Sequence, residues 1–469
     1  MTTEAGSGPA AGDVLELTVG EVVHGGWCVS RQDDTGWVIL VRHALPGERV
    51  LATITQATAR FARADATRIL TASADRVPPP CPYARPGGCG GCDWQHARLP
   101  AQRELKAEVI RQQLARIGRI DRPVRVEPVG GDQGGLGWRT VVSFAVGRDG
   151  AAGLRKHRSH DIVAIDRCLI AHELVTGADA TGLAWPGAEA VEVSVAPETG
   201  QRGVLVTGPR NAGQLPEVEA DSVQLARAPD RRRSHARRPV TGLSGARTLP
   251  TGTSGARRLG VARRTEPAAR TEPARVPVRG SGYLTHRAAG RSWRVTLGGF
   301  WQVHPGAADV LAAAVLAEAS PQPGDVALDL YCGAGLFAGV LAAAVGPDGA
   351  VIAIEQDPAA VRDARHNLRD FPWVRVHRAD AGSVLSQSGA GDARVAVLDP
   401  PRTGASRAVI EALSAPGALR KVAYVSCDPA TLARDLRLLL DAGWELTGLR
   451  GYDAFPMTHH VECLATLSR

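Results

Sequence analysis

The C-terminal part of the sequence predicts an α/β fold built on a doubly wound parallel sheet. From about residue 293 onward, apolar runs rich in Val, Ile, Leu and Ala alternate with helical patterns, an arrangement typical of parallel strands joined by helices. Three of these runs end in sharp turns rich in Gly, Asp and Pro. We expect the sheet over residues 293–469, preceded by an OB-like β-barrel and a small β-rich central domain.

Short alternating apolar runs, separated by Gly and Asp, fill residues 13–77. Runs of this kind predict hairpins, and a small barrel is the simplest fold for them. The segment resembles a TRAM domain, a compact barrel used as an RNA-binding appendage, chiefly in Gly25-Gly26 and in ALPGE at 44–48. We therefore expect residues 1–77 to form a TRAM-like barrel that binds RNA. Three basic side chains in this segment have two possible roles, contact with phosphate or a solvated face: Arg60, Arg63 and Arg68.

A cluster of cysteines follows the expected barrel. Cys81, Cys89 and Cys92 have the spacing Cys-x7-Cys-x2-Cys in a loop rich in Pro and Gly, and Cys168 stands alone further along the chain. Three thiolates on such a loop with one distant thiolate can hold a cubane iron–sulfur cluster or a tetrahedral zinc ion. The spacing alone leaves both open, and a set of unrelated free thiols is the third interpretation.

Residues 78–292 are expected to form the central β-rich domain. Residues 99–117 have the apolar stripe of an amphipathic helix. Three later segments, at 124–130, 138–147 and 161–170, predict antiparallel strands. Residues 226–279 are rich in Arg, Pro, Gly and Thr and nearly free of large apolar side chains, so we expect a disordered basic insertion. It either holds RNA loosely or is a tolerated linker.

The first strand of the expected sheet leads into a glycine turn at 329–335, reading DLYCGAG, and Glu355 ends the second strand. Glycines let the backbone approach a ligand, and a carboxylate at the second strand end can bind both ribose hydroxyls. Together they indicate an adenosine cofactor. Ala338 stands where the dinucleotide fingerprint has its third glycine, which favours S-adenosylmethionine over NAD.

Asp399 begins a second sharp turn, Asp-Pro-Pro-Arg, after another apolar run. The two prolines make the turn rigid and project the carboxylate into the expected cleft. Methyltransferases that act on exocyclic amines carry an aromatic ring where this chain has Arg402, so amine methylation fits poorly. Asp380 either contacts the adenine edge or is a surface carboxylate.

Residues 422–436, VAYVSCDPATLARDL, predict a buried strand, a tight turn and a helix start. Asp428 is a suitable N-cap, and Pro429 suits the first helical turn. Cys427 therefore lies at the carboxyl end of a strand, where open α/β sheets bind their ligands. We expect the helix N-terminus to lower the pKa of this thiol and favour a thiolate nucleophile; the alternative is a small buried core residue.

Composition is typical of a globular, cytoplasmic enzyme. No apolar stretch is long enough to span a membrane, and the N-terminus lacks the features of a signal peptide. Lys and Arg number 55 against 48 Asp and Glu, a net charge of +7, which favours a polyanionic partner. Nothing in the sequence indicates an obligate protein partner.

Five segments closely resemble the RNA 5-methyluridine methyltransferase family. They are FWQVHP (300–305), DLYCGAG (329–335), LDPPRTGA (398–405), YVSCDPATLARDL (424–436) and DAFPMTHHVECLATL (453–467). The resemblance covers most of 293–469 and implies a class I S-adenosylmethionine-dependent methyltransferase domain. The barrel and the four cysteines resemble the iron–sulfur members of the family, which favours a 4Fe-4S cluster over zinc.

The resemblance implies Cys427 as nucleophile and Glu462 as base. It places four further residues in or beside the cofactor pocket: Gln302, Tyr331, Glu355 and Asp399. The expected reaction transfers a methyl group from S-adenosylmethionine to carbon 5 of a uridine in structured RNA, with 23S ribosomal RNA as the first candidate. The alternatives are a transfer RNA substrate or an inactive RNA-binding relative. His459 and His460 are expected to pack or to contact RNA.

Overall fold

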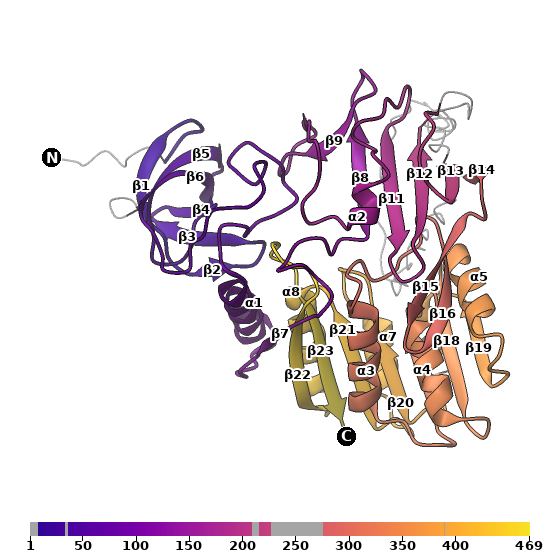
Figure 1. Ribbon diagram of the computed structural model, residues 1–469. Helices are drawn as coiled ribbons and strands as arrows, with labels where there is room; N and C mark the ends of the chain where they lie inside the picture. The colour runs from indigo at the N-terminus through magenta and orange to yellow at the C-terminus, as the bar shows by residue number, and fades with distance from the viewer. Residues whose placement is uncertain (1–7, 33–35, 209–214, 227–274, 389) are drawn as a thin grey trace, which may run out of the picture.

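In the computed structural model, the described residues are 8–32, 36–208, 215–226, 275–388 and 390–469. They form an N-terminal sheet, a central sheet and a large C-terminal sheet flanked by helices (Figure 1). A two-stranded hairpin, β15 (Tyr283–Ala288) with β16 (Arg291–Thr296), links the central and C-terminal parts. Among the described helices, none is both long and apolar enough to cross a lipid bilayer.

The N-terminal sheet has six strands in the order β1-β5-β6-β4-β3-β2. Alternate side chains such as Ile39, Val41 and Val50 are fully buried on its inner face, which explains the alternating sequence pattern. Backbone hydrogen bonds between the Gly20–Glu21 turn and Val29 curl the sheet back on itself. The expected strands are confirmed: β1 (Val14–Thr18), β2 (Val22–Val23), β3 (Trp27–Arg31), β4 (Val38–Arg42), β5 (Arg49–Ala57) and β6 (Phe61–Thr71).

The central sheet has seven strands in the order β10-β9-β8-β11-β12-β13-β14. Its strands are β8 (Val141–Val146), β9 (Ala152–Arg155), β10 (Ile162–Val163), β11 (Ala190–Ala196), β12 (Gln201–Thr207), β13 (Ser222–Ala226) and β14 (Arg275–Arg279), with the short helix α2 (Glu173–Thr176) beside them. The prediction of disorder over 226–279 was wrong at both ends. Ala226 ends β13, and 275–279 form the edge strand β14, where Pro277 is tolerated because one side of the strand is unpaired. Residues 227–274 lie outside the described residues.

The C-terminal sheet has eight strands in the order β19-β18-β17-β20-β21-β23-β22-β7. Its first five strands are parallel, as expected, whereas β23 is antiparallel to both β21 and β22. The sheet is therefore mixed, because β22 and β23, the last two strands along the chain, form an antiparallel pair. The strands are β7 (Val126–Pro128), β17 (Val326–Leu330), β18 (Ala350–Glu355), β19 (Val374–Arg378), β20 (Val395–Leu398), β21 (Lys421–Ser426), β22 (Glu445–Asp453) and β23 (Glu462–Ser468).

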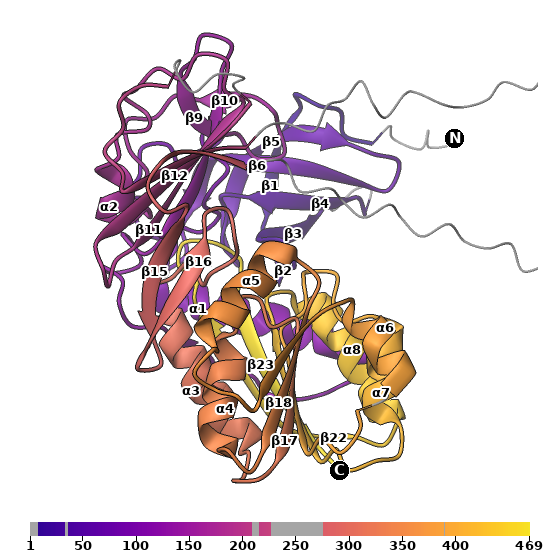
Figure 2. The same ribbon diagram turned by 90° about the vertical axis from the view of Figure 1, so that its right-hand side faces the viewer.

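Helices cover both faces of the large sheet (Figure 2). Neighbouring residues of one strand point to opposite faces, so Ala423 packs with α3 and α4 while Tyr424 packs with α7 and α8. The helices of the first face are α3 (Ala307–Ala319), α4 (Leu336–Val345) and α5 (Pro358–Asn367). Those of the second face are α6 (Ala381–Ser388), α7 (Arg407–Ser414) and α8 (Pro429–Asp441).

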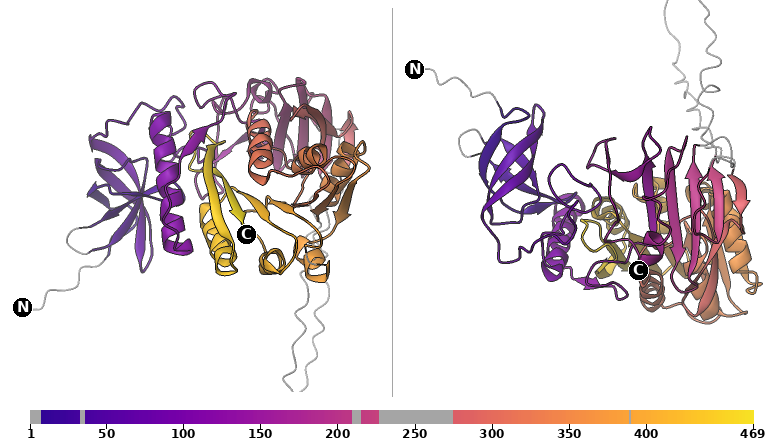
Figure 3. Two further views of the ribbon diagram at one scale, coloured as in Figure 1. Left: turned by 90° about the horizontal axis from the view of Figure 1, so that it is seen from below. Right: turned by 45° about the horizontal axis from the view of Figure 1, so that its top comes forward.

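The expected helix at 99–117 is α1 (Leu99–Gln113), which continues as one π-helical turn, η1 (Leu114–Gly118). It contacts β2, β7 and α8, and so lies between the N-terminal sheet and the large sheet (Figure 3). The prediction of an antiparallel central strand at 124–130 was wrong. Its residues Val126–Pro128 form β7, which pairs in parallel with β22. Gly451 permits this approach, because a Cβ there would lie 2.8 Å from Val126 Cγ2.

Candidate active site at the carboxyl edge of the large sheet

One edge of the large sheet carries most of the expected site residues. Tyr331, Asp399 and Cys427 follow the carboxyl ends of β17, β20 and β21, and Glu355 is the last residue of β18. Glu462 begins the antiparallel strand β23 and therefore lies at the same edge. The strand order places β20, β21 and β23 side by side, which gathers Asp399, Cys427 and Glu462.

The ladder between β21 and β23 brings Cys427 and Glu462 opposite each other. Its last pair is Ser426 with Cys463. One step beyond this pair, Cys427 follows β21 and Glu462 begins β23, so the two residues face each other. The Glu462 side chain is buried, with a residue exposure of 4%. Its Oε1 has no hydrogen-bond partner among the described residues. A buried, unpartnered carboxylate oxygen beside a thiol is available to a substrate group.

Asp399 and Glu462 are two carboxyls at this edge of the sheet. Burial raises the pKa of Asp399 to about 7. Burial and the charge of Asp399 raise the pKa of Glu462 well above its ordinary value, and Arg402 partly opposes this shift. Neighbouring carboxyls with raised pKa values hold protons more tightly than exposed carboxyls do, so both are stronger bases when ionised.

Burial and the charges of Glu462 and Asp399 raise the pKa of the Cys427 thiol to about 11. The expectation of a lowered pKa was therefore wrong. Asp428 is the N-cap that the sequence predicts, but its Oδ1 accepts hydrogen bonds from the Ala430 and Thr431 backbone N–H groups of α8. The helix N-terminus thus stabilises the carboxylate of Asp428 instead of the thiolate.

Alkylation of Cys427 should become faster with rising pH, because only the thiolate reacts. With a pKa of about 11, the rate should increase about tenfold for each pH unit between about 7 and 10. The measurement is mass spectrometry of the Cys427 peptide after timed reaction with iodoacetamide. If the rate instead rises no further above about pH 8, the thiol is already ionised there, and the free enzyme holds a thiolate.

The turn after β17 has an unusual backbone conformation. Tyr331, Gly333 and Gly335 all have positive φ, of 68°, 53° and 96°, and Tyr331 is a strained non-glycine residue of a kind common at functional sites. Glu355 Oε2 accepts a hydrogen bond of 3.1 Å from the Gly333 N–H. A Cβ on Gly333 would meet no atom within 4 Å. The strand end and the glycine turn therefore border open space, as a cofactor cradle requires.

Asp329 is a site candidate that the sequence interpretation did not single out. It is fully buried, with 0% exposure, and its Oδ2 accepts a 2.7 Å hydrogen bond from the Ala338 N–H. Its Oδ1 has no partner among the described residues, and burial raises its pKa to about 8. Its place near the end of the first strand, as the first residue of the segment 329–335, was the available signal.

The remaining expected cofactor residues have different surroundings. Gln302 is buried in the segment before α3. The next residue, Val303, anchors this segment, because its carbonyl accepts hydrogen bonds from the N–H and the hydroxyl of Thr140. Asp380 is exposed after β19, and its Oδ1 accepts hydrogen bonds from the backbone and hydroxyl of Ser383 in the first turn of α6. Asp380 therefore has a structural role in this turn.

The four expected ligand cysteines line one pocket, formed by the cysteine loop and by central residues up to Ile170: Cys81, Cys89, Cys92 and Cys168. Within the described part of the chain, no three His, Cys, Asp or Glu side chains lie close enough together to hold a single metal ion. Burial raises the pKa of the Cys89, Cys92 and Cys168 thiols, and the charge of Arg139 partly opposes this for Cys89 and Cys168. The fold thus gathers the four sulfurs around a shared space.

Known families match both halves of the large sheet. Residues 392–469 match the family described as tRNA (uracil-5-)-methyltransferase. Residues 307–390 match the family described as protein-L-isoaspartate(D-aspartate) O-methyltransferase. The first match contains Asp399, Cys427 and Glu462, and the second contains the glycine turn and Glu355.

The whole chain is similar to proteins named uncharacterized RNA methyltransferases. It is 46% identical to one from Streptomyces coelicolor, over 97% of this chain and 93% of that protein. Identity to one from Streptomyces avermitilis is 44%, over 97% and 98%. The fold is similar to that of Pyrococcus abyssi tRNA (uracil-54, C5)-methyltransferase in complex with S-adenosyl-L-homocysteine, with a TM-score of 0.67, 18% identity and coverage of 97% and 100%. The chain belongs to the RNA 5-methyluridine methyltransferase family.

Proposed function

We propose that this RNA methyltransferase transfers a methyl group from S-adenosylmethionine to carbon 5 of a uridine in structured RNA. The placement of Cys427 opposite Glu462 at the end of the β21–β23 ladder carries this proposal. Uracil carbon 5 is a poor nucleophile, so the chemistry needs a sulfur that adds to the ring and a base that later removes a proton. The presence of both Cys427 and Glu462 argues against an inactive RNA-binding relative, because RNA binding alone requires neither a nucleophile nor a base.

Cys427 loses its proton to solvent, and the thiolate forms a bond from its sulfur to carbon 6, which leaves enolate electrons at carbon 5. S-adenosylmethionine, when bound, would supply the methyl group that carbon 5 accepts and would leave as S-adenosylhomocysteine. Glu462 then removes the carbon 5 proton, the ring double bond re-forms, and the carbon–sulfur bond breaks to release the Cys427 thiolate. The raised pKa of Glu462 suits this role, because a carboxylate with a higher pKa is a stronger base.

We further propose that the glycine turn and the neighbouring strand ends hold the cofactor. The open space above Gly333 and the position of Glu355 support this assignment. The residues in or beside the pocket would be Gln302, Tyr331, Glu355, Asp380 and Asp399. Asp380 is the weakest member of the set, because its hydrogen bonds to Ser383 already explain its position.

We assign residues 1–77 as a TRAM-like, OB-like barrel that binds RNA, 78–292 as the central domain and 293–469 as the methyltransferase domain. The exposed side chains of Arg60 and Arg68 support RNA binding. Basic side chains on a protein surface favour contacts with phosphates. His24 Nε2 lies 3.4 Å from Asp428 Oδ2, so the barrel adjoins the Cys427 turn. A uridine flipped out of its stack would reach both.

We propose a 4Fe-4S cluster in the cysteine pocket, with zinc as the alternative. The four sulfurs that line one pocket support a cluster, because four thiolates are the usual ligands of a cubane iron–sulfur centre. When bound, the cluster would supply a structural crosslink between the loop and Cys168.

Protein purified without oxygen should have an absorption band near about 400 nm, because iron–sulfur clusters absorb there. Cys81→Ser and Cys168→Ser should lose the band, whereas Cys28→Ser should keep it, because Cys28 is buried in the core of the N-terminal sheet. A colourless protein with one zinc ion per chain would contradict the cluster.

Ribosomal RNA is the first candidate substrate, and transfer RNA is the second because the matched family description names it. The test incubates the enzyme and labelled S-adenosylmethionine with transcripts of 23S ribosomal RNA and of transfer RNA. The expected result is labelled 5-methyluridine after digestion of the 23S transcript. Label in another nucleoside would refute the proposed reaction, and label only in transfer RNA would select the second substrate.

A further inference from the structure

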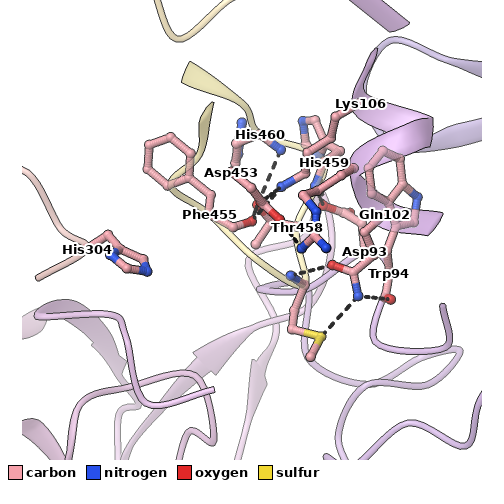
Figure 4. Close-up of polar contacts among 12 residues, drawn as sticks. Asp93, Trp94, Gln102, Lys106, His304, Asp453, Phe455, Thr458, His459 and His460 are labelled. Atoms are coloured by element: carbon pink, nitrogen blue, oxygen red, sulfur yellow. Dashed lines mark hydrogen bonds and ion pairs between the residues drawn. The ribbon is translucent and has the colours of Figure 1, made fainter. Parts of the chain in front are cut away.

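The loop 454–461 joins β22 to β23 and leads directly into Glu462; we call it the base loop. Three side chains from the segment 93–106, far away in the sequence, contact this loop or the residue before it (Figure 4). They are Asp93, Gln102 and Lys106, which we call the loop clamp. Asp93 follows the cysteine loop, and the other two lie on α1.

Lys106 holds the start of the base loop. Its side chain is completely buried, with 0% exposure, and forms an ion pair with the equally buried Asp453 at the end of β22. Lys106 Nζ also donates a 3.0 Å hydrogen bond to the Phe455 carbonyl. A buried ammonium with two oxygen partners fixes geometry, because losing either partner leaves a costly unpaired group.

Gln102 holds the middle of the base loop. Its residue exposure is 0%, and its Oε1 accepts a 2.8 Å hydrogen bond from the Met457 N–H. Its Nε2 donates to the carbonyls of Trp94 and Ala97, at 3.1 and 2.8 Å. Met457 has a positive φ of 67°. Such a conformation persists only where surrounding contacts enforce it.

Asp93 holds the end of the base loop. Its Oδ2 accepts a 3.1 Å hydrogen bond from the His459 N–H and lies 2.6 Å from His459 Nδ1. The backbone N–H groups of Asp93 and Trp94 both donate to the Met457 carbonyl, at 3.0 Å each. Gly26 permits this packing, because a Cβ there would lie 2.9 Å from His459 Cβ.

We propose that the loop clamp positions Glu462 for removal of the carbon 5 proton. This inference rests on the proposed function of Glu462. Glu462 Oε1 has no partner among the described residues. The ladders with β21 and β22 hold the backbone at the start of β23, and the loop clamp holds the segment that leads into it. Asp93, Gln102 and Lys106 are positioning residues, since they act through the backbone of the base loop. The clamp therefore acts after methyl transfer, at release of the enzyme from RNA.

The test compares Gln102→Leu with Gln112→Leu. Both glutamines are buried on α1, but Gln112 bonds Glu21 and Glu108 instead of the base loop. In single-turnover reactions, Gln102→Leu should bind S-adenosylmethionine and form the covalent RNA adduct as the unaltered enzyme does. It should release the RNA about ten- to a hundredfold more slowly, because small misplacements of a reacting group cost this much. Gln112→Leu should release it at the normal rate.

Two further variants make the result decisive. If Gln102→Leu fails to fold, His459→Ala serves instead. It removes the ring contacts with Asp93 and His460 and keeps the backbone N–H bond to Asp93; it too should retain the adduct longer. Normal release by a folded clamp variant would overturn the inference. Glu462→Gln separates the proposed base role of Glu462 from the proposed positioning role of the loop clamp. If Glu462→Gln retains the adduct while the clamp variants do not, only the positioning role is refuted. If Glu462→Gln forms no lasting adduct, the proposed role of Glu462 fails.

Discussion

Cys427→Ala should abolish methyl transfer while leaving S-adenosylmethionine binding nearly unchanged. The sulfur of Cys427 is the only group at this edge that we expect to add to uracil carbon 6, and its loss leaves carbon 5 inert. The expected decrease in kcat is on the order of 10⁶-fold, the scale seen when a nucleophile is removed from other enzymes. The measurement is transfer of tritiated methyl groups to RNA, together with calorimetry for cofactor affinity.

Cys28→Ala is the matched control for this experiment. Cys28 is a buried thiol in the core of the N-terminal sheet, and burial raises its pKa to about 12. Its replacement should leave the rate of methyl transfer within a few-fold of normal. Substantial activity in Cys427→Ala would show that another group activates the uridine, and the covalent mechanism would be wrong.

Glu462→Gln should accumulate a covalent protein–RNA adduct. Glutamine has the shape of glutamate but cannot accept the carbon 5 proton, so release should slow by on the order of 10²-fold or more. Formation of the adduct should not slow. The charge of Glu462 raises the pKa of Cys427, so its removal favours the thiolate that attacks carbon 6. The adduct is detected as a band of reduced mobility on a denaturing gel.

Glu318→Gln is the matched control for the base. Glu318 contacts Thr466 on β23 and lies away from the carboxyl edge. This variant should release methylated RNA at the normal rate. If Glu462→Gln also released RNA normally, some other group would have to remove the carbon 5 proton.

Local sequence patterns predict much of this molecule. The strand, turn and helix around Cys427 follow from a β-branched run, an N-capping Asp428 and Pro429, all within a few residues of one another. The antiparallel pairing of 462–468 with β21 then accounts for the meeting of Cys427 and Glu462. The roles of these two residues came from family motifs, because no local rule pairs residues so far apart in the chain.

Features that depend on distant contacts could not be predicted in this way. Val126 pairs with β22, and the lack of a side chain at Gly451 leaves room for this pairing only in the folded chain. The pKa of Cys427 depends on Glu462 and Asp399, which are neighbours only in the folded chain. Gln102 and Lys106 resemble ordinary helix residues in the sequence, and only the fold places them against the base loop.

The addition of β7 to the large sheet has a consequence for biosynthesis. An uncovered β22 would present free backbone groups that invite edge-to-edge association between molecules. The ribosome makes β7 before β22, so the partner strand already exists when the catalytic half emerges. A fragment lacking the N-terminal third should therefore self-associate even though it contains the whole proposed catalytic pair.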